Sequence, residues 1–174
     1  EVLITIFVFL FALTGSLGII KLVAAGHQIR FYPGNYKNCI HTLFYTLNEE
    51  IILGALLLKG IQHFAKKAPD WFISVCTAFI FAIIHFVFFK WIFRNTGNLD
   101  FITMLSLFAV GIIRNNLILR TGHIGYSWAL HFAWIYVMLG SSHFDQTQNV
   151  FLTDFERFQV YLGDFWVLNA CLLL

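Results

Sequence analysis

Hydrophobic residues occur along the chain in long runs that are separated by short polar segments. A helix needs about 20 mostly apolar residues to cross a bilayer, and several runs approach that length. Turn-forming and charged residues end the runs, as in Tyr-Pro-Gly-Asn at 32–35 and Lys-Lys-Ala-Pro-Asp at 66–70. The pattern predicts six membrane-spanning helices, at residues 2–25, 40–64, 71–93, 101–119, 124–140 and 160–174.

These runs predict an all-α fold, a polytopic transmembrane helix bundle that forms a single membrane domain over residues 1–174. We expect no strands, because open sheet edges cannot be satisfied in lipid and alternating segments of about ten residues are absent. The polar segment 141–157 is expected to lie at the membrane surface. No internal repeat is present in the sequence.

The composition favours lipid as the solvent of this chain. Of its 174 residues, 59% are hydrophobic and 11% are charged, whereas about 25% of a soluble domain is charged. The net charge of +2, without a basic run, argues against nucleic acid as a partner. Cys39, Cys76 and Cys171 lie in apolar surroundings without zinc-site spacing, so we interpret them as small core residues.

The ends of the chain bear on its topology. The first apolar run lacks a basic flank before it and a small-residue cleavage site after it, so it is predicted to be a membrane span and not a signal peptide. The start at Glu1 and the end at Leu174 suggest a segment of a longer protein. We expect an integral multi-pass protein of the cell (inner) membrane. Lysine and arginine divide six to five between the two membrane surfaces, which leaves the orientation open.

Two adjacent glutamates, Glu49 and Glu50, interrupt the second apolar run. An ionised side chain at membrane depth costs at least about 2.5 kcal/mol, so such residues are typical of functional sites. Helices rise by about 1.5 Å per residue. On that scale Glu49, His85 and His131 all lie about 12 to 13 Å below the surface reached by the ends of spans one, three and five. We therefore expect these three side chains to meet.

A carboxylate and two imidazoles at one level are compatible with two kinds of chemistry. The glutamate can act as general base for a water while a histidine stabilises the oxyanion. Alternatively, the glutamate and the two histidines can bind a metal that activates water, although the helical motif His-Glu-x-x-His is absent. A buried ion pair that only joins helices would require no chemistry. Because Glu49 and Glu50 are about 100° apart on a helix, Glu50 is expected to satisfy a neighbouring helix or a basic partner.

Three motifs in this order resemble the CAAX protease and bacteriocin-processing (Abi-type) family of intramembrane glutamic endopeptidases, which includes the type II CAAX prenyl endopeptidases. Glu-Glu-x-x-x-Arg is matched in part at 49–54, Phe-x-x-x-His at 81–85, and His-x-x-x-Asn/Asp in part at 131–135. The resemblance covers about residues 43–136. It implies an all-helical membrane protease that acts on peptide or membrane-protein substrates in the lipid bilayer.

The resemblance also implies roles for four residues. Glu49 and His85 would activate a water, His131 would polarise the carbonyl group, and Glu50 would be a supporting carboxylate. These four are the predicted catalytic residues. No cofactor and no metal is expected for this mechanism.

Two positions depart from the family motifs, because Gly54 replaces the arginine and Ile135 replaces the asparagine. An oxyanion donor of this kind has contributed about 2.7 to 4 kcal/mol where it was tested. We hypothesise that Arg114, although deeper by the same estimate of rise, or the indole N–H of Trp134 compensates. The alternatives are a divergent or inactive relative that acts as a membrane immunity or regulatory protein, and a transporter or proton relay.

Overall fold

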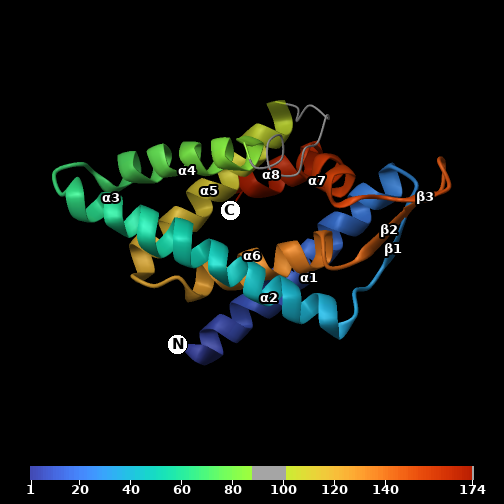
Figure 1. Cartoon of the computed structure of the whole chain (residues 1–174), viewed down its shortest axis with the longest axis horizontal. Helices are drawn as coiled ribbons and strands as arrows, with labels where there is room; N and C mark the ends of the chain where they lie inside the picture. Colours follow the sequence, from blue (N-terminus) through green and yellow to red (C-terminus); the bar gives the residue numbers. More distant parts are fainter. Residues whose placement is uncertain (88–100, 174) are drawn as a thin grey trace.

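The computed structural model describes residues 1–87 and 101–173 and shows a bundle of helices with a small sheet at one end (Figure 1). The first helix, α1, extends over Val2–Gly26. A second, continuous helical rod is built from α2 (Tyr36–Glu49), the π-helix η1 (Glu50–Leu58) and α3 (Lys59–Phe64). The remaining helices are α4 (Asp70–Val87), α5 (Phe101–Thr121), α6 (Gly125–Met138), α7 (Asp154–Leu162) and α8 (Phe165–Leu173).

The helices confirm the predicted all-α membrane fold. Three of them are long and apolar enough to cross a bilayer, with mean hydropathies of 2.5 for α1, 1.9 for α4 and 1.7 for α5. The α1 and α5 boundaries agree with the predicted spans to within two residues. The total of six spans stays a prediction. The end of the third predicted span, residues 88–93, lies outside the described residues.

Two predicted spans differ from the helices in the structure for local reasons. The rod begins at Tyr36, earlier than expected, because the Asn35 side chain accepts a hydrogen bond from the Asn38 N–H (3.0 Å) and caps the helix. The expectation of one continuous helix at 160–174 is wrong. Asp164 accepts a hydrogen bond from the Trp166 N–H (2.8 Å) and starts a new helix, which separates α7 from α8.

The expectation that the chain has no strands is also wrong. Three short antiparallel strands form a sheet in the order β1 (Ile29–Tyr32), β2 (Ser142–Asp145), β3 (Val150–Phe151). In the first pair Ile29 lies opposite Asp145. All three strands fall in the connections between the apolar helices, where water can satisfy the edges of the sheet, so the argument from lipid did not apply to them.

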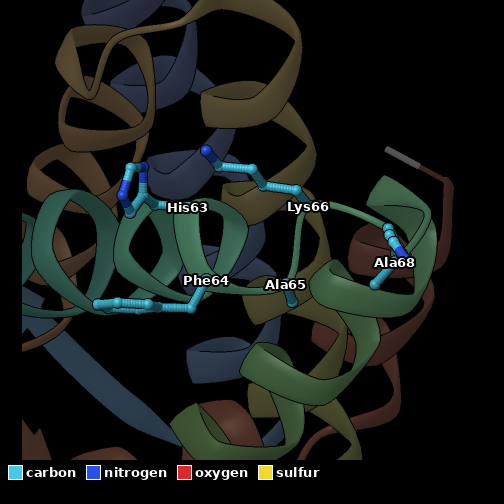
Figure 2. A pocket seen from close by; sticks show the side chains of 6 residues that line it. His63, Phe64, Ala65, Lys66 and Ala68 are labelled. Atoms are coloured by element: carbon cyan, nitrogen blue, oxygen red, sulfur yellow. The ribbon is translucent and has the colours of Figure 1, made fainter.

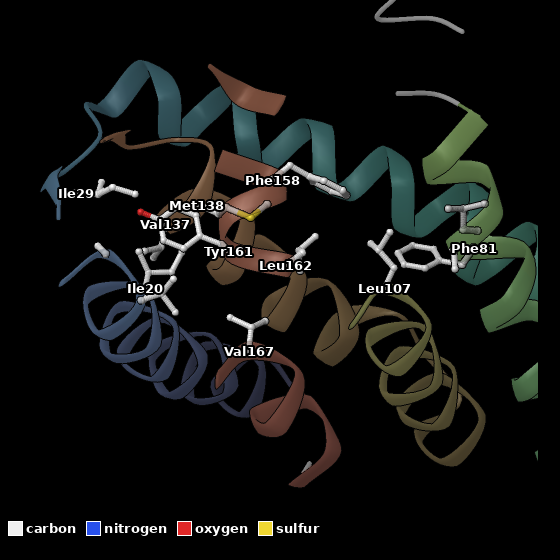
Figure 3. Close-up of a cluster of buried hydrophobic side chains, with 14 residues drawn as sticks. Ile20, Ile29, Phe81, Leu107, Val137, Met138, Phe158, Tyr161, Leu162 and Val167 are labelled. Carbon is white, nitrogen blue, oxygen red and sulfur yellow. The ribbon is translucent and has the colours of Figure 1, made fainter. Parts of the chain in front are cut away.

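The helices pack around one main hydrophobic core. Helix α1 lies along α6, and α4 lies along α5 (Figure 1). Figure 3 shows core side chains from most of the helices, among them Ile20 of α1, Phe81 of α4, Leu107 of α5 and Val137 of α6, each at most 4% exposed. A smaller cluster of Leu58, Ile73 and Ile118 joins the rod to α4 and α5. This packing fixes the rod, α4 and α6 against one another, and these are the elements that carry the predicted site.

Candidate active site

The two glutamates lie where the α-helix of the rod changes into a π-helix. Glu49 is the last residue of α2, and Glu50 is the first residue of η1. The Glu50 side chain is fully buried, and the Glu49 side chain is 13% exposed. π-Helical turns are rare and occur frequently at functional sites. The change from α-helix to π-helix therefore falls at the two glutamates that the sequence analysis predicted to be functional.

His85, near the end of α4, contacts the first glutamate. Its Nε2 atom lies 3.3 Å from Glu49 Oε1. Its other ring nitrogen, Nδ1, is 2.9 Å from the Phe81 carbonyl oxygen. Because a carbonyl oxygen can only accept, Nδ1 carries a proton and donates the hydrogen bond. The Phe81 backbone thus fixes the imidazole orientation and directs Nε2 toward Glu49.

His131, on α6, lies between the two carboxylates. Its Nδ1 atom is 3.1 Å from Glu50 Oε1, and its Nε2 atom is 3.8 Å from Glu49 Oε2. The predicted meeting of Glu49, His85 and His131 is thus found in the structure, whereas their catalytic roles stay a prediction. The two nitrogens of one imidazole allow adjacent glutamates, which diverge around the helix axis, to share a single partner.

Glu50 has the neighbouring partners that were expected for it. Its Oε2 atom accepts a hydrogen bond from the Ser127 hydroxyl (2.8 Å), and Arg114 Nε is 4.0 Å away. The sequence analysis missed Ser127. The signal was present, because Ser127 precedes His131 by four residues and therefore lies on the same face of α6.

Arg114 reaches the site although the estimate of helical rise placed it deeper. A long side chain carries its charged group well away from its own backbone, and the guanidinium carbon lies 4.7 Å from the centre of the Phe81 ring. Arg114 also donates to Asn115 Oδ1 (3.2 Å). The Asn115 amide in turn donates to the Ser74 carbonyl oxygen (2.9 Å) and the Thr77 hydroxyl (2.7 Å) of α4.

The two departures from the family motifs have different surroundings. A side chain at Gly54 would meet Ile118 Cδ1 and Glu50 Oε2, at 2.8 and 3.1 Å from its first carbon. Ile135 is partly buried and packs against the main core. The Trp134 indole N–H is buried and forms no hydrogen bond within the part of the chain that the structure describes. Of the two residues proposed to compensate, Arg114 lies 4.0 Å from Glu50, whereas the described residues give no such contact for Trp134.

The described part of the chain also has a surface hollow away from the glutamates. Figure 2 shows that this hollow lies at the end of α3 and contains none of the predicted site residues; its lining is the segment His63, Phe64, Ala65, Lys66, Lys67 and Ala68. Across residues 1–87 and 101–173, no three His, Cys, Asp or Glu side chains are grouped to hold a metal ion.

Long apolar helices around a buried pair of carboxylates and two histidines define an α-helical membrane protein with a polar centre suited to acid–base chemistry. The chain matches the family model of the type II CAAX prenyl endopeptidase Rce1-like proteins over residues 39–137, more than half of its length. It belongs to this family of membrane endopeptidases, which confirms the resemblance of its motifs. The matched segment contains Glu49, Glu50, His85 and His131. The searches of curated proteins and of solved structures found no significant match.

Proposed function

We propose that the protein is an intramembrane, metal-independent endopeptidase that uses Glu49 to hydrolyse peptide bonds of membrane-associated substrates. The observation that carries this proposal is the position of the Glu49 carboxylate, 3.3 Å from His85 and 3.8 Å from His131, inside an apolar bundle. The substrates are peptides or membrane proteins in the bilayer, and CAAX-type peptides are one candidate class because of the family. We place the protein in the cell (inner) membrane with several spans.

Glu49 and His85 are the groups that activate the water. Glu49 Oε1 is buried, lies 3.3 Å from His85 Nε2, and keeps a lone pair that can accept a hydrogen bond from a water. The water oxygen forms a bond to the carbonyl carbon as its proton passes to the carboxylate. When the tetrahedral intermediate breaks down, the C–N bond cleaves and this proton leaves on the amine nitrogen. When the His85 ring carries a proton on both nitrogens, Nε2 donates to the Glu49 carboxylate and stabilises its negative charge.

His131 is the group that stabilises the oxyanion. Its Nδ1 atom donates to the Glu50 carboxylate, so Nε2 can donate to the oxyanion only when the ring carries a proton on both nitrogens. A preorganised donor of this kind is effective because it needs no reorganisation during the reaction. Glu50 keeps the imidazole in place, with the Ser127 hydroxyl holding Glu50 from the other side.

A second candidate function is a catalytically divergent relative that acts as a membrane immunity or regulatory protein. Gly54 and Ile135 are the observations that favour it, because both replace polar side chains of the family motifs. Ile135 supplies no side-chain hydrogen-bond donor beside His131. The arginine that is missing at position 54 is a smaller loss, because Arg114 places a cation next to Glu50 from another helix.

Cleavage of a membrane-peptide library by the purified protein in detergent separates these functions. We expect Glu49→Gln, which keeps the shape and removes the base, to reduce cleavage about 10²- to 10⁴-fold. Glu1→Gln is the matched control, because Glu1 is exposed and lies outside the site. Activity should persist with a chelator; its loss would instead assign the site to metal chemistry. A folded wild type that cleaves nothing would favour the regulatory function.

A further inference from the structure

The buried charge of Glu50 raises the question of what balances it. Its side chain is fully buried, and an ion in the protein interior needs a well-placed opposite charge and hydrogen bonds. Its contacts in the structure are with Ser127, His131 and Arg114. Among the lysines and arginines of the described residues, Arg114 forms an ion pair with this carboxylate.

Arg114 is held in a fixed orientation by α4 and by its own neighbour. Its guanidinium lies over the Phe81 ring and donates to Asn115, which is itself bonded to the Ser74 carbonyl and the Thr77 hydroxyl. Its Nε and Nη1 atoms form no hydrogen bonds within the part of the chain that is described. Nε is the atom closest to Glu50, so the guanidinium is oriented toward the carboxylate.

The contacts of Glu50 connect Arg114 to the reacting groups. Arg114 approaches Oε2, whereas Oε1 receives the His131 Nδ1–H. Holding the carboxylate therefore holds the His131 ring, whose Nε2 faces Glu49. A side chain at Gly54 would come within 3.1 Å of the same Oε2 atom. The glycine leaves this side of Oε2 clear.

We infer that Arg114 is a positioning residue: it fixes Glu50, and through Glu50 it fixes the imidazole of His131 against Glu49. This inference rests on the proposed function for its effect on catalysis, but the contacts predict an effect on His131 without it. Among the described residues, Arg114 forms no hydrogen bond or ion pair with Glu49 or His85, so it is not assigned to the chemistry itself.

The catalytic test compares wild type, Arg114→Gln and Arg114→Lys with the same membrane-peptide library. We expect Arg114→Gln to lower kcat about 10- to 100-fold, as loss of a supporting contact commonly does, with KM within about twofold because substrate binding is not removed. Arg114→Lys keeps the charge and should restore part of kcat. Arg120→Gln, at the exposed end of the same helix, is the matched control. Equal kcat for all four proteins would overturn the inference.

A second readout does not require activity. The imidazole ¹⁵N resonances of His131 should shift in Arg114→Gln and not in Arg120→Gln. If the wild type cleaves nothing, the proposed function fails and this comparison alone decides the role of Arg114; unchanged resonances would overturn it. If Arg114→Gln does not fold, the double variant Glu50→Gln/Arg114→Gln, which removes both charges, should recover folding. Failure of the double variant to fold would show that Arg114 acts through packing.

Discussion

His143 occupies a buried position in β2, and its protonation should control the stability of the protein in acid. The side chain is 1% exposed. Its Nε2 atom is 3.3 Å from the Val137 carbonyl oxygen, which can only accept, so Nε2 carries the proton. Nδ1 then accepts a hydrogen bond from the Tyr161 hydroxyl (2.6 Å). The neutral ring is satisfied at both nitrogens, whereas a second proton would end the hydrogen bond that Tyr161 donates and would place a positive charge in this buried position.

Burial, together with the nearby charge of Arg157, lowers the pKa of His143 from 6.5 to about 4. In the unfolded chain the same imidazole takes up a proton near pH 6.5. The stability that the neutral ring contributes is therefore complete above pH 6.5 and is lost as the pH falls toward 4. The difference between these two pKa values of His143, 6.5 and about 4, corresponds to roughly 3 kcal/mol of unfolding free energy.

Thermal unfolding in detergent at pH 7.5 and pH 4.5 tests this value against a variant that cannot titrate, His143→Gln. At pH 4.5 the wild type should have lost roughly 2 to 3 kcal/mol through His143. Its melting temperature should fall roughly 5 to 10 °C further than that of the variant. The other six histidines are common to both proteins and cancel in the comparison. An equal fall for the two proteins would refute the assignment of acid sensitivity to His143.

Two other substitutions give distinct outcomes. Gly34→Ala would place a methyl group against the Gly140 carbonyl oxygen, so we expect a loss of about 1 to 3 kcal/mol in unfolding free energy. Gly18→Ala, whose methyl group meets nothing within 4 Å, is the control and should be neutral or slightly stabilising. A similar loss in both variants would contradict the steric explanation for Gly34. Ser127→Ala removes the hydrogen bond to Glu50 and should lower kcat about 10-fold in the peptide-cleavage assay. An unchanged kcat would exclude a role for this hydroxyl.

The geometry of the site could be predicted from the sequence because each predicted residue lies inside a long apolar run. The ends of these runs are marked by turns, so counting residues from an end gives a depth in the membrane. Glu49, His85 and His131 met as expected. The same count misplaced Arg114, because rise per residue locates a backbone atom and not the end of a long side chain.

The features that were missed depend on contacts between distant parts of the chain. The pairing of β1 with β2 places Ile29 opposite Asp145, and the hydrophobic pattern of neither segment indicates which strand it pairs with. The π-helix η1 leaves no mark in the sequence, since its side chains are those of an ordinary apolar helix. The break between α7 and α8 was missed because Asp164 caps α8 within a run that is otherwise apolar.

The position of α1 has a consequence for how the protein is made. Helix α1 packs mainly against α6, in the far half of the chain, and the Phe9 ring stacks on Phe132 at 5.0 Å between ring centres. A ribosome adds about 5 to 20 residues per second, so the hundred or so residues that separate these partners take roughly 5 to 20 s to synthesise. During that interval α1 lacks the α6 side chains that it packs against. Formation of α1 and completion of the bundle are therefore separate events, and the second waits for α6.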